Sequence, residues 1–453
     1  MTSFPGEVRH GARRPLWRAA LAAALLAVSL ASCSSEPPRP SGEPSATPSA
    51  APGTEPPPAE PPPVAKDWPR WGFTHTQYSV DNETMTAAEG VTRAFRRAPM
   101  LQNQHIMGFG ASNPEPSPGR YDWRSLDSRL QVIDRSGGLP VITLCCAPDW
   151  MKGGRPGETD WHRLTEAPLP EHYDDFAKLA AEVAKRYPHV RHYLVWNEFK
   201  GFYRHGRPDA EAYTALYNKV YAALKEVDPD IQVGGPYLPI NSHTDGPDRR
   251  LRGPWGVVDG ATLDALEYWL EHKAGADFIV VDGASVTEEH DLLPDEFGAL
   301  AKFDAVTRWL REKSGNLPVW WAEWYVEPEE ERWDERHRLA VQTVAMMEFA
   351  RSGAATALYW SPQRQGGACP GCLWRPRTAT PLPAYELLGN FVRWFPAGVE
   401  LEPVTSSNPA VRVLAQRHRM VMVNTTGEAV VADVDGKTHR FGPYEIIWSE
   451  RTT

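Results

Sequence analysis

Runs of consecutive apolar residues alternate along the chain with segments in which apolar residues return every three to four positions. The runs have the length of strands that are buried on both faces, and the other segments have the spacing of amphipathic helices. Eight strands are predicted on this basis, at Arg70–His75, Asn103–Gly110, Leu139–Ala147, Val190–Glu198, Ile231–Tyr237, Ala276–Gly283, Leu317–Trp324 and Ala355–Ser361. Helices are predicted between them, for example at Tyr173–Tyr187, Ala212–Val227 and Arg336–Ser352, with a last one at Pro383–Phe395.

Strands that are each followed by a helix predict a parallel sheet covered by helices, and therefore an α/β protein. Eight such units are the count of a (β/α)8 TIM barrel, which we predict for residues 67–396. An open, doubly wound sheet is the structural alternative, but no glycine-rich phosphate loop follows the first strand. After Pro396 the pattern changes to short alternating runs such as "VRVLAQR" and "MVMVNTT". These runs predict a small antiparallel β domain of the sandwich type at residues 397–453.

The first 33 residues have the order of an export signal. Four arginines precede a stretch, Ala19–Ala31, that is too short for a permanent membrane span, and small residues follow it. The end of this leader, "LASC", resembles the lipobox of bacterial lipoproteins, which implies cleavage before Cys33 and acylation of its thiol. We therefore expect a signal peptide and a lipoprotein on the outer face of the bacterial cell membrane, the alternative being a secreted protein. Arg13 and Arg14 leave both the general and the twin-arginine export routes open.

Residues 34–66 form a proline-rich segment, with proline at 12 of the 31 positions from Ser34 to Val64. Such a composition cannot bury a core, so we predict a disordered, extended tether that reaches on the order of 100 Å. A folded domain behind it would be held away from the membrane.

The chain is acidic, and this charge limits its partners. The formal net charge of −10 becomes −13 without the leader, which carries four arginines and one glutamate. Because no basic cluster compensates for it, we expect no nucleic acid and no anionic lipid as partners. Tryptophan is abundant, with 18 residues, and exposed indoles are good platforms for sugar rings.

Four cysteines remain beside Cys33. In an exported protein a lone CxxC pair favours a local disulfide, so we expect a bridge between Cys369 and Cys372. A bond between the neighbours Cys145 and Cys146 is a second, weaker expectation. A zinc site and free thiols are the alternatives for these four residues, and we expect no metal and no other cofactor.

Polar and aromatic residues stand where the predicted strands end, which is the edge of this barrel fold that carries active sites. Two of them are glutamates, Glu198 in "VWNEF" on strand four and Glu323 in "WWAEW" on strand seven. A buried, unpaired carboxylate is costly, so two that face one barrel mouth indicate a functional pair. The further candidates for substrate contacts are His75, Asp149, Trp150, Trp196, Asn197, Tyr237, Asp282 and Trp360.

Two carboxylates on opposite sides of an anomeric carbon are what glycoside hydrolysis needs. One of them must hold a proton for the leaving oxygen, and we expect the apolar neighbours Trp196 and Phe199 to raise the pKa of Glu198 by desolvation. The other carboxylate must stay ionised and attack. The amide of Asn197 can bind a sugar hydroxyl next to the reacting carbon.

Asn-Glu at the end of strand four and Glu at the end of strand seven resemble the pattern of the clan A glycoside hydrolases. The motifs "NPEPSPGRYDWRSLD", "APDWM", "VWNE", "VDPDIQVGGPY" and "AEW" resemble family 39, the β-xylosidase and α-L-iduronidase family, and the similarity runs from Trp68 to about Phe395. This resemblance implies a retaining double displacement. Glu198 would be the general acid/base, Glu323 the nucleophile and Asn197 the partner of the 2-hydroxyl group.

Two positions depart from the family pattern. Phe199 and Lys200 follow the acid/base glutamate where the family has Pro-Asn, and "VVDGAS" stands at strand six where the family has His-x-Tyr. Both positions shape substrate subsites, so the chemistry is predicted and the sugar is not. The prediction is a retaining glycoside hydrolase that cleaves an oligo- or polysaccharide. A non-catalytic polysaccharide-binding lipoprotein and a transglycosylase on the same barrel are the alternatives.

Overall fold

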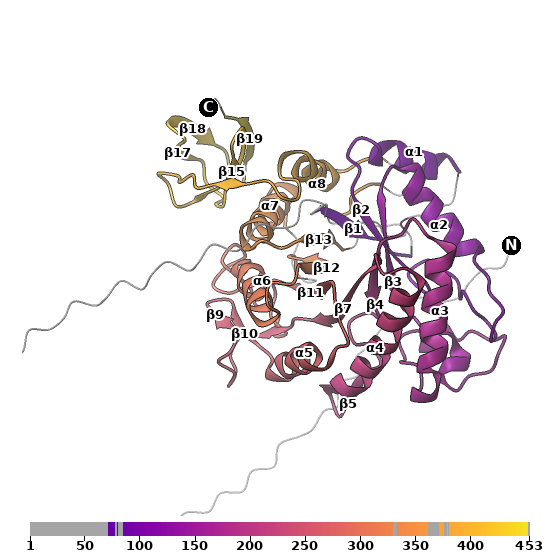
Figure 1. Ribbon diagram of the computed structural model, residues 1–453. Helices are drawn as coiled ribbons and strands as arrows, with labels where there is room; N and C mark the ends of the chain where they lie inside the picture. The colour runs from indigo at the N-terminus through magenta and orange to yellow at the C-terminus, as the bar shows by residue number, and fades with distance from the viewer. Residues whose placement is uncertain are drawn as a thin grey trace, which may run out of the picture. The chain divides into compact units, whose positions relative to one another are not determined.

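Eight parallel strands close into a barrel in the order β1-β13-β12-β11-β7-β4-β3-β2 (Figure 1). A computed structural model describes residues 71–451 except 78, 80–84, 329–332, 361–370, 376–377 and 379. The predicted leader, Cys33 and the proline-rich tether lie outside these residues. The barrel strands are β1 Trp71–Thr74, β2 Leu101–His105, β3 Leu139–Leu144, β4 His192–Val195, β7 Gln232–Pro239, β11 Phe278–Ala284, β12 Val319–Tyr325 and β13 Thr356–Tyr359.

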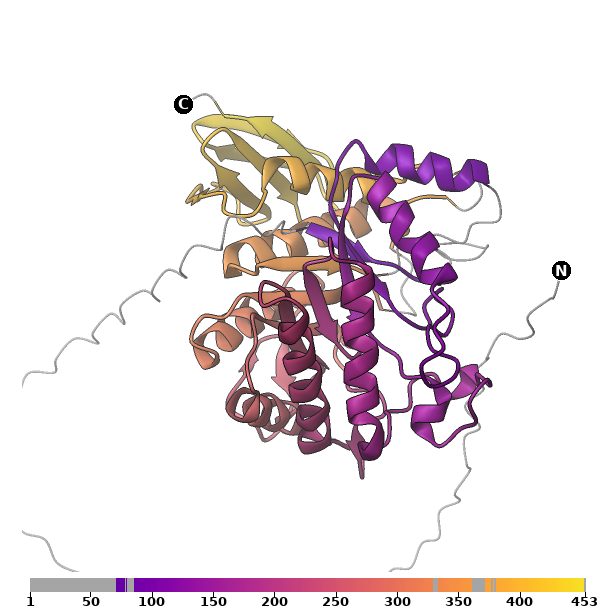
Figure 2. The same cartoon turned by 45° about the vertical axis from the view of Figure 1, so that its right-hand side comes forward.

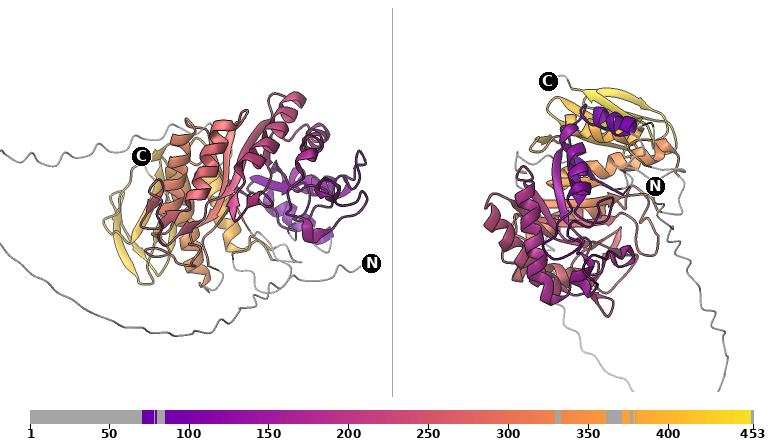
Figure 3. Two further views of the ribbon diagram at one scale, coloured as in Figure 1. Left: turned by 90° about the horizontal axis from the view of Figure 1, so that it is seen from below. Right: turned by 90° about the vertical axis from the view of Figure 1, so that its right-hand side faces the viewer.

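A helix follows each barrel strand, which confirms the predicted TIM barrel (Figure 3). Local sequence marks several helix ends: the Asp209 and Asp259 side chains cap α4 and α5, and Gly353, at φ 74°, ends α7. The helices are α1 Met85–Phe95, α2 Arg124–Arg135, α3 Tyr173–Arg186, α4 Ala210–Val227, α5 Gly260–His272, α6 Ala301–Lys313, α7 Glu335–Ser352 and α8 Pro383–Trp394. Within the described residues, these helices are too short or too polar to cross a bilayer.

The barrel has two layers of packing. One buried cluster is drawn from the strands and the turn before β13, and it fills the interior with residues such as Leu194, Val280 and Ala322. A larger cluster lies between the strands and the helices, where Trp321 contacts Phe303 of α6 and Phe349 of α7. Alternate residues of a strand therefore face the interior and the helices.

Short elements decorate the loops, and a β region follows the barrel. The loops contain β5 Tyr203–Arg204, β6 Arg207–Pro208, β8 Ser242–His243, β9 Arg252–Gly253 and β10 Gly256–Val258. The C-terminal strands are β14 Leu401–Glu402, β15 Val411–Gln416, β16 Arg419–Asn424, β17 Val430–Val434, β18 Lys437–Phe441 and β19 Ile446–Glu450.

The C-terminal strands form a four-stranded antiparallel sheet, β14-β15-β16-β19, and a β17-β18 hairpin that share one apolar core. Figure 2 shows this region, in yellow, beside the last helices of the barrel. The ring of Trp448 on β19 lies 5.4 Å from Phe391 and 5.3 Å from Trp394, both on α8. These indole and phenyl contacts attach the β region to the barrel.

Candidate active site

Glu198 stands on a tight turn that follows β4. The backbone of Trp196, Glu198 and Phe199 has φ angles of 69°, 50° and 53°, a left-handed conformation that large side chains rarely adopt. Tyr213 on α4 holds this turn by donating a hydrogen bond to the carbonyl of Val195 at 2.8 Å. Strained backbone of this kind persists where its surroundings enforce it and gathers at functional sites.

Glu323 lies on β12 and is 4% exposed. In a regular strand it would point toward the helices, because the preceding Ala322 faces the barrel interior. The register of β12 slips against β13 between Trp321 and Trp324, and such a slip re-aims the side chains within it. The hydroxyl of Tyr237, on β7, donates a hydrogen bond of 2.7 Å to Glu323 Oε1.

A third carboxyl group joins the two glutamates. One oxygen from each of Glu198, Asp282 and Glu323 lies within 4.8 Å of the others. Asp282 is fully buried on β11, directly beside Glu323 in the strand pairing. These three are the carboxylates of the described residues that are close enough together to hold a metal ion.

Lys200 places a positive charge in this cluster. Its ammonium group forms an ion pair with Glu198 Oε2, and it lies 5.9 Å from the ring centre of Phe109. Lys200 was not among the predicted site residues, although its position in "FKGFY" was marked as a departure from the family pattern. That departure was the available signal for it.

The pKa values of the three carboxyl groups are shifted in different directions. Burial, followed by the negative charge of Glu198, raises the pKa of Glu323 to about 8. The same two causes raise the pKa of Asp282 well above its usual value. Burial alone would raise the pKa of Glu198, but a hydrogen bond from Asp282 and the charge of Lys200 outweigh it and lower this pKa.

The lowered pKa of Glu198 contradicts the expectation that apolar neighbours raise it. Phe199 is buried as expected, and desolvation does act on Glu198, yet the sequence did not place Asp282 and Lys200 against the carboxylate. Charge and hydrogen bonding therefore decide the direction of the shift.

Besides Asp282, two polar side chains at the mouth are fully buried without a well-formed hydrogen bond to a described residue: Asn197 and His105. Asn197 was predicted, whereas His105, at the end of β2, was not. Burial lowers the pKa of His105 to about 3, and the adjacent Asn197 opposes this shift. Unsatisfied buried groups are expensive, so both side chains are available to a ligand.

Aromatic rings line the same region. The ring of Phe109 stacks on His105 at 4.1 Å, and the half-buried Trp360 approaches Phe109 edge-on at 6.1 Å. The predicted Trp360 thus lies near His105 and Lys200. Tyr203 and Tyr325 were not predicted, yet burial and the nearby charges of Asp282 and Glu198 raise the pKa of both hydroxyl groups.

Four residues that were predicted to contact the substrate form hydrogen bonds or ion pairs within the protein instead: His75, Asp149, Trp150 and Trp196. His75 is fully buried, and its two ring nitrogens are hydrogen-bonded to Ser79 at 2.7 Å and Gln102 at 3.0 Å. The ring of Trp196 has no exposed surface, and its indole N–H donates to the carbonyl of Lys200 at 2.7 Å. A buried side chain at a strand end can face the helices, which the strand pattern alone does not reveal.

Asp149 and Trp150 begin η1, Asp149–Lys152, in the loop after β3. Asp149 accepts a hydrogen bond from the backbone of Asp160 and lies 3.3 Å from the ammonium of Lys152. The indole N–H of Trp150 donates to the carbonyl of Glu115 at 2.9 Å. Both side chains stabilise loops, and no contact joins them to the glutamates among the described residues.

Of the two expected disulfides, the one between Cys145 and Cys146 was the weaker expectation, and it is the one that the described residues can test. Cys145 and Cys146 form a disulfide at the end of β3, with both residues fully buried. Cys372 is buried and disulfide-bonded, whereas Cys369 lies outside the described residues. The predicted bridge between Cys369 and Cys372 stays a prediction.

Replacing Lys200 with Met is expected to move the basic limb of the kcat/KM profile to higher pH. The ammonium of Lys200 lowers the pKa of Glu198, and the acid/base role predicted for Glu198 requires its protonated form. Its removal therefore lets Glu198 keep its proton at higher pH. The control is Lys200→Arg, which retains the charge and should retain the limb. An unchanged profile for Lys200→Met would mean that Glu198 does not titrate on that limb.

Comparison with known proteins finds a β-xylosidase that matches part of the chain. A β-xylosidase of Caldicellulosiruptor saccharolyticus is 26% identical to the chain over 218 residues, which is 46% of this chain and 41% of that protein. The match thus spans less than half the length of this relative. No protein-family model matches the chain.

Solved structures resemble the fold over most of its length. A monomeric β-xylosidase from Caulobacter crescentus CB15 has a TM-score of 0.55 and 17% identity, over 81% of this chain and 75% of that one. A family 39 glycoside hydrolase from Bacteroides cellulosilyticus WH2 has a TM-score of 0.56 and 15% identity, over 82% and 74% of the two chains. At these identities the likeness establishes the fold, which agrees with the resemblance to family 39 drawn from the motifs.

Proposed function

We propose that this protein is a retaining glycoside hydrolase that cleaves an oligo- or polysaccharide. The observation that carries the proposal is the approach of one oxygen of Glu198 and one of Glu323 to within 4.8 Å at the C-terminal ends of the barrel strands. The carboxyl groups of retaining enzymes are about 5–5.5 Å apart, and those of inverting enzymes are about 6.5–9.5 Å apart to admit a water molecule. The short separation favours attack by one carboxylate on the sugar itself.

Glu323 is the nucleophile in this proposal. It attacks the anomeric carbon and forms a covalent glycosyl-enzyme, while the bond to the leaving oxygen breaks. The hydrogen bond from Tyr237 fixes Glu323 Oε1 and stabilises its charged form. Burial and Glu198 act against this charge and raise the pKa of Glu323 to about 8, so the ionised form that attacks is favoured as the pH rises toward that value.

Glu198 is the acid/base. In its protonated form Glu198 passes its proton to the leaving oxygen, which completes the first step. In the second step the ionised Glu198 takes a proton from the water that cleaves the glycosyl-enzyme. Asn197, buried and without a protein partner of good geometry, binds the hydroxyl next to the reacting carbon.

The substrate class rests on the relatives. The matched relative is a β-xylosidase, which supports a β-linked substrate. The predicted signal and the "LASC" motif support a location outside the cell, on the bacterial membrane through Cys33. Its substrate would then be a glycan that is present outside the cell, at or near the cell surface.

The test is hydrolysis of a panel of aryl glycosides and oligosaccharides, followed by NMR to read the anomer formed first. We expect turnover of at least one β-glycoside and initial release of the β-anomer. An initial α-anomer would contradict the retaining mechanism. Binding without cleavage would favour the non-catalytic alternative, and transfer to added acceptor sugars in place of hydrolysis would favour the transglycosylase.

A further inference from the structure

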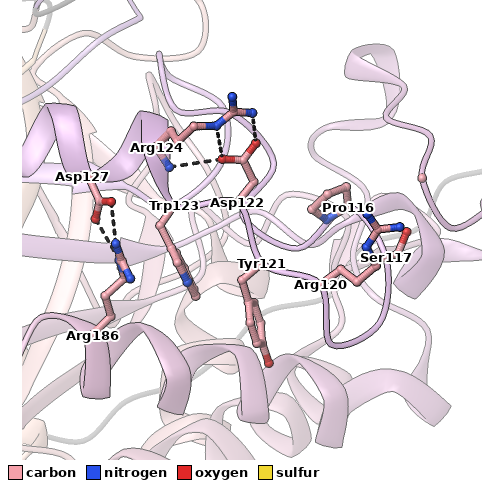
Figure 4. A pocket seen from close by; sticks show the side chains of 10 residues that line it. Pro116, Ser117, Arg120, Tyr121, Asp122, Trp123, Arg124, Asp127 and Arg186 are labelled. Carbon is pink, nitrogen blue, oxygen red and sulfur yellow. Dashed lines mark hydrogen bonds and ion pairs between the residues drawn. The ribbon is translucent and has the colours of Figure 1, made fainter.

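A pocket of about 650 Å³ lies on the flank of the barrel, outside the carboxylate cluster. Its wall is formed by the loop between β2 and α2 and the first turn of α2, together with Gly157 of the loop after β3 and Arg186 at the end of α3 (Figure 4). None of the residues that line it belongs to the candidate active site. Its volume is within the range of about 300–1,000 Å³ that is usual for small-molecule sites.

Two stacked rings stand at the centre of this pocket. Tyr121 and Trp123 are nearly parallel, with ring centres 5.1 Å apart and an angle of 16° between the planes. The guanidinium of Arg186 lies 5.6 Å from the ring centre of Trp123. In Figure 4, Pro116, Ser117 and Arg120 lie on the far side of Tyr121 from Trp123. The face of Tyr121 turned away from Trp123 is therefore the aromatic surface that a ligand can reach.

The pocket is held open by charge pairs at its rim. Arg124 donates to Asp122 at 2.9 and 2.5 Å, and Arg186 donates to Asp127 at 2.8 and 2.6 Å. These pairs satisfy one another, so the rim does not demand a charged ligand. They also fix the ends of the segment that carries Tyr121 and Trp123.

Other polar groups in the pocket form no hydrogen bond or ion pair with a described side chain. Among the described residues, no hydrogen-bond partner is found for the hydroxyls of Ser117 and Tyr121, the indole N–H of Trp123 or the guanidinium of Arg120. Three of these groups, the hydroxyls of Ser117 and Tyr121 and the guanidinium of Arg120, thus surround one accessible aromatic face. A ligand that matches them needs a flat apolar side and several hydroxyl groups, which is the chemistry of a sugar ring.

We propose that this pocket is a second saccharide-binding site, which holds a neutral sugar unit of a polysaccharide away from the catalytic centre. The choice of a sugar as ligand rests in part on the proposed function. The ring of the sugar stacks on Tyr121, and Ser117 and Arg120 bond its hydroxyls. Two contacts on one polymer chain raise the effective concentration of that chain at the catalytic mouth.

The test is affinity electrophoresis of the full chain carrying Glu323→Gln, so that the polymer is not cut during the run. The gels contain arabinoxylan, hydroxyethylcellulose or polygalacturonate, and the variants Tyr121→Ala and Arg120→Ala are added to the Glu323→Gln protein. We expect a neutral polymer to retard the parent, and Tyr121→Ala to weaken this binding about tenfold. Arg120 is exposed, so its variant retains the fold and should weaken binding several-fold.

The matched control is Tyr268→Ala. Tyr268 is also half-buried and stacked on another ring, His272 at 4.0 Å, but it lies on α5. Its removal should leave the retardation unchanged. In the protein with Glu323 intact, Tyr121→Ala should raise the KM for the polymer and leave kcat/KM for a small aryl glycoside within twofold.

The proposal is overturned if no neutral polymer retards the parent, if only polygalacturonate does, or if Tyr121→Ala and Arg120→Ala both migrate as the parent does. An equal loss with Tyr268→Ala would overturn it too, because the effect would then not belong to the pocket. Binding is measured here without turnover. A failure of the hydrolase proposal and a failure of this one are therefore seen in separate experiments.

Discussion

Replacing Glu323 with Gln is expected to lower turnover of activated aryl glycosides by about four orders of magnitude or more. The amide keeps the shape of the side chain and can still accept the hydrogen bond from Tyr237, so the fold is retained. It cannot form the covalent ester with the sugar. The measurement is the initial rate of aryl release with purified protein, together with a thermal unfolding curve.

Glu348→Gln is the matched control for this variant. Glu348 is also largely buried, with its side chain 18% exposed, and it lies on α7 with Arg351 as its ion-pair partner. Its loss should lower stability slightly and leave the rate unchanged. Retained full activity in Glu323→Gln would rule out Glu323 as the nucleophile and, with it, the proposed mechanism.

Replacing Glu198 with Ala is expected to slow the hydrolysis of substrates with poor leaving groups about 10²- to 10⁴-fold. Substrates with very good leaving groups need no proton and should still form the glycosyl-enzyme, which then accumulates because no base activates water. Azide is small enough to enter the space left by the carboxylate and needs no base. Added azide should therefore restore turnover and give a glycosyl azide of retained configuration.

The product and the dependence on the leaving group separate this role from a structural one. A simple loss of stability would slow all substrates alike and would not respond to azide. An azide product of inverted configuration would assign Glu198 as the nucleophile and exchange the two roles. The same assay on Asn197→Ala should show no azide effect, since Asn197 carries no proton in the mechanism.

Much of the site could be predicted from where the strands end. Glu198, Asn197, Asp282, Tyr237 and Glu323 gather because parallel strands bring their C-terminal ends to one edge of the barrel. The strand pattern predicts the edge at which these residues gather, whereas the register slip in β12 and the turn after β4 set how Glu323 and Glu198 are aimed.

The other features of the site depend on the conformation of the loops, which the pattern of apolar and polar residues does not predict. Asp149 was expected to face the substrate, yet its carboxylate forms an ion pair inside the loop with Lys152, three residues later. Lys200 enters the site because the backbone turns left-handed at Glu198 and Phe199, a conformation that their side chains do not favour. The pKa of Glu198 is lowered first by the hydrogen bond with Asp282 and then by the charge of Lys200, so its direction could not be derived from apolar neighbours.

The closure of the barrel also sets an order of events for folding. The first strand, β1, is completed by β13 on one side, and the indole N–H of Trp71 donates to the carbonyl of Phe395, 324 residues further along the chain. Contacts this distant in sequence form slowly, because a long loop must first be closed. The ring of strands can therefore be sealed only after almost the whole chain has been made available. Under the export that the leader predicts, the final folding step, and with it the assembly of the carboxylate cluster, would come late in the transfer of the chain.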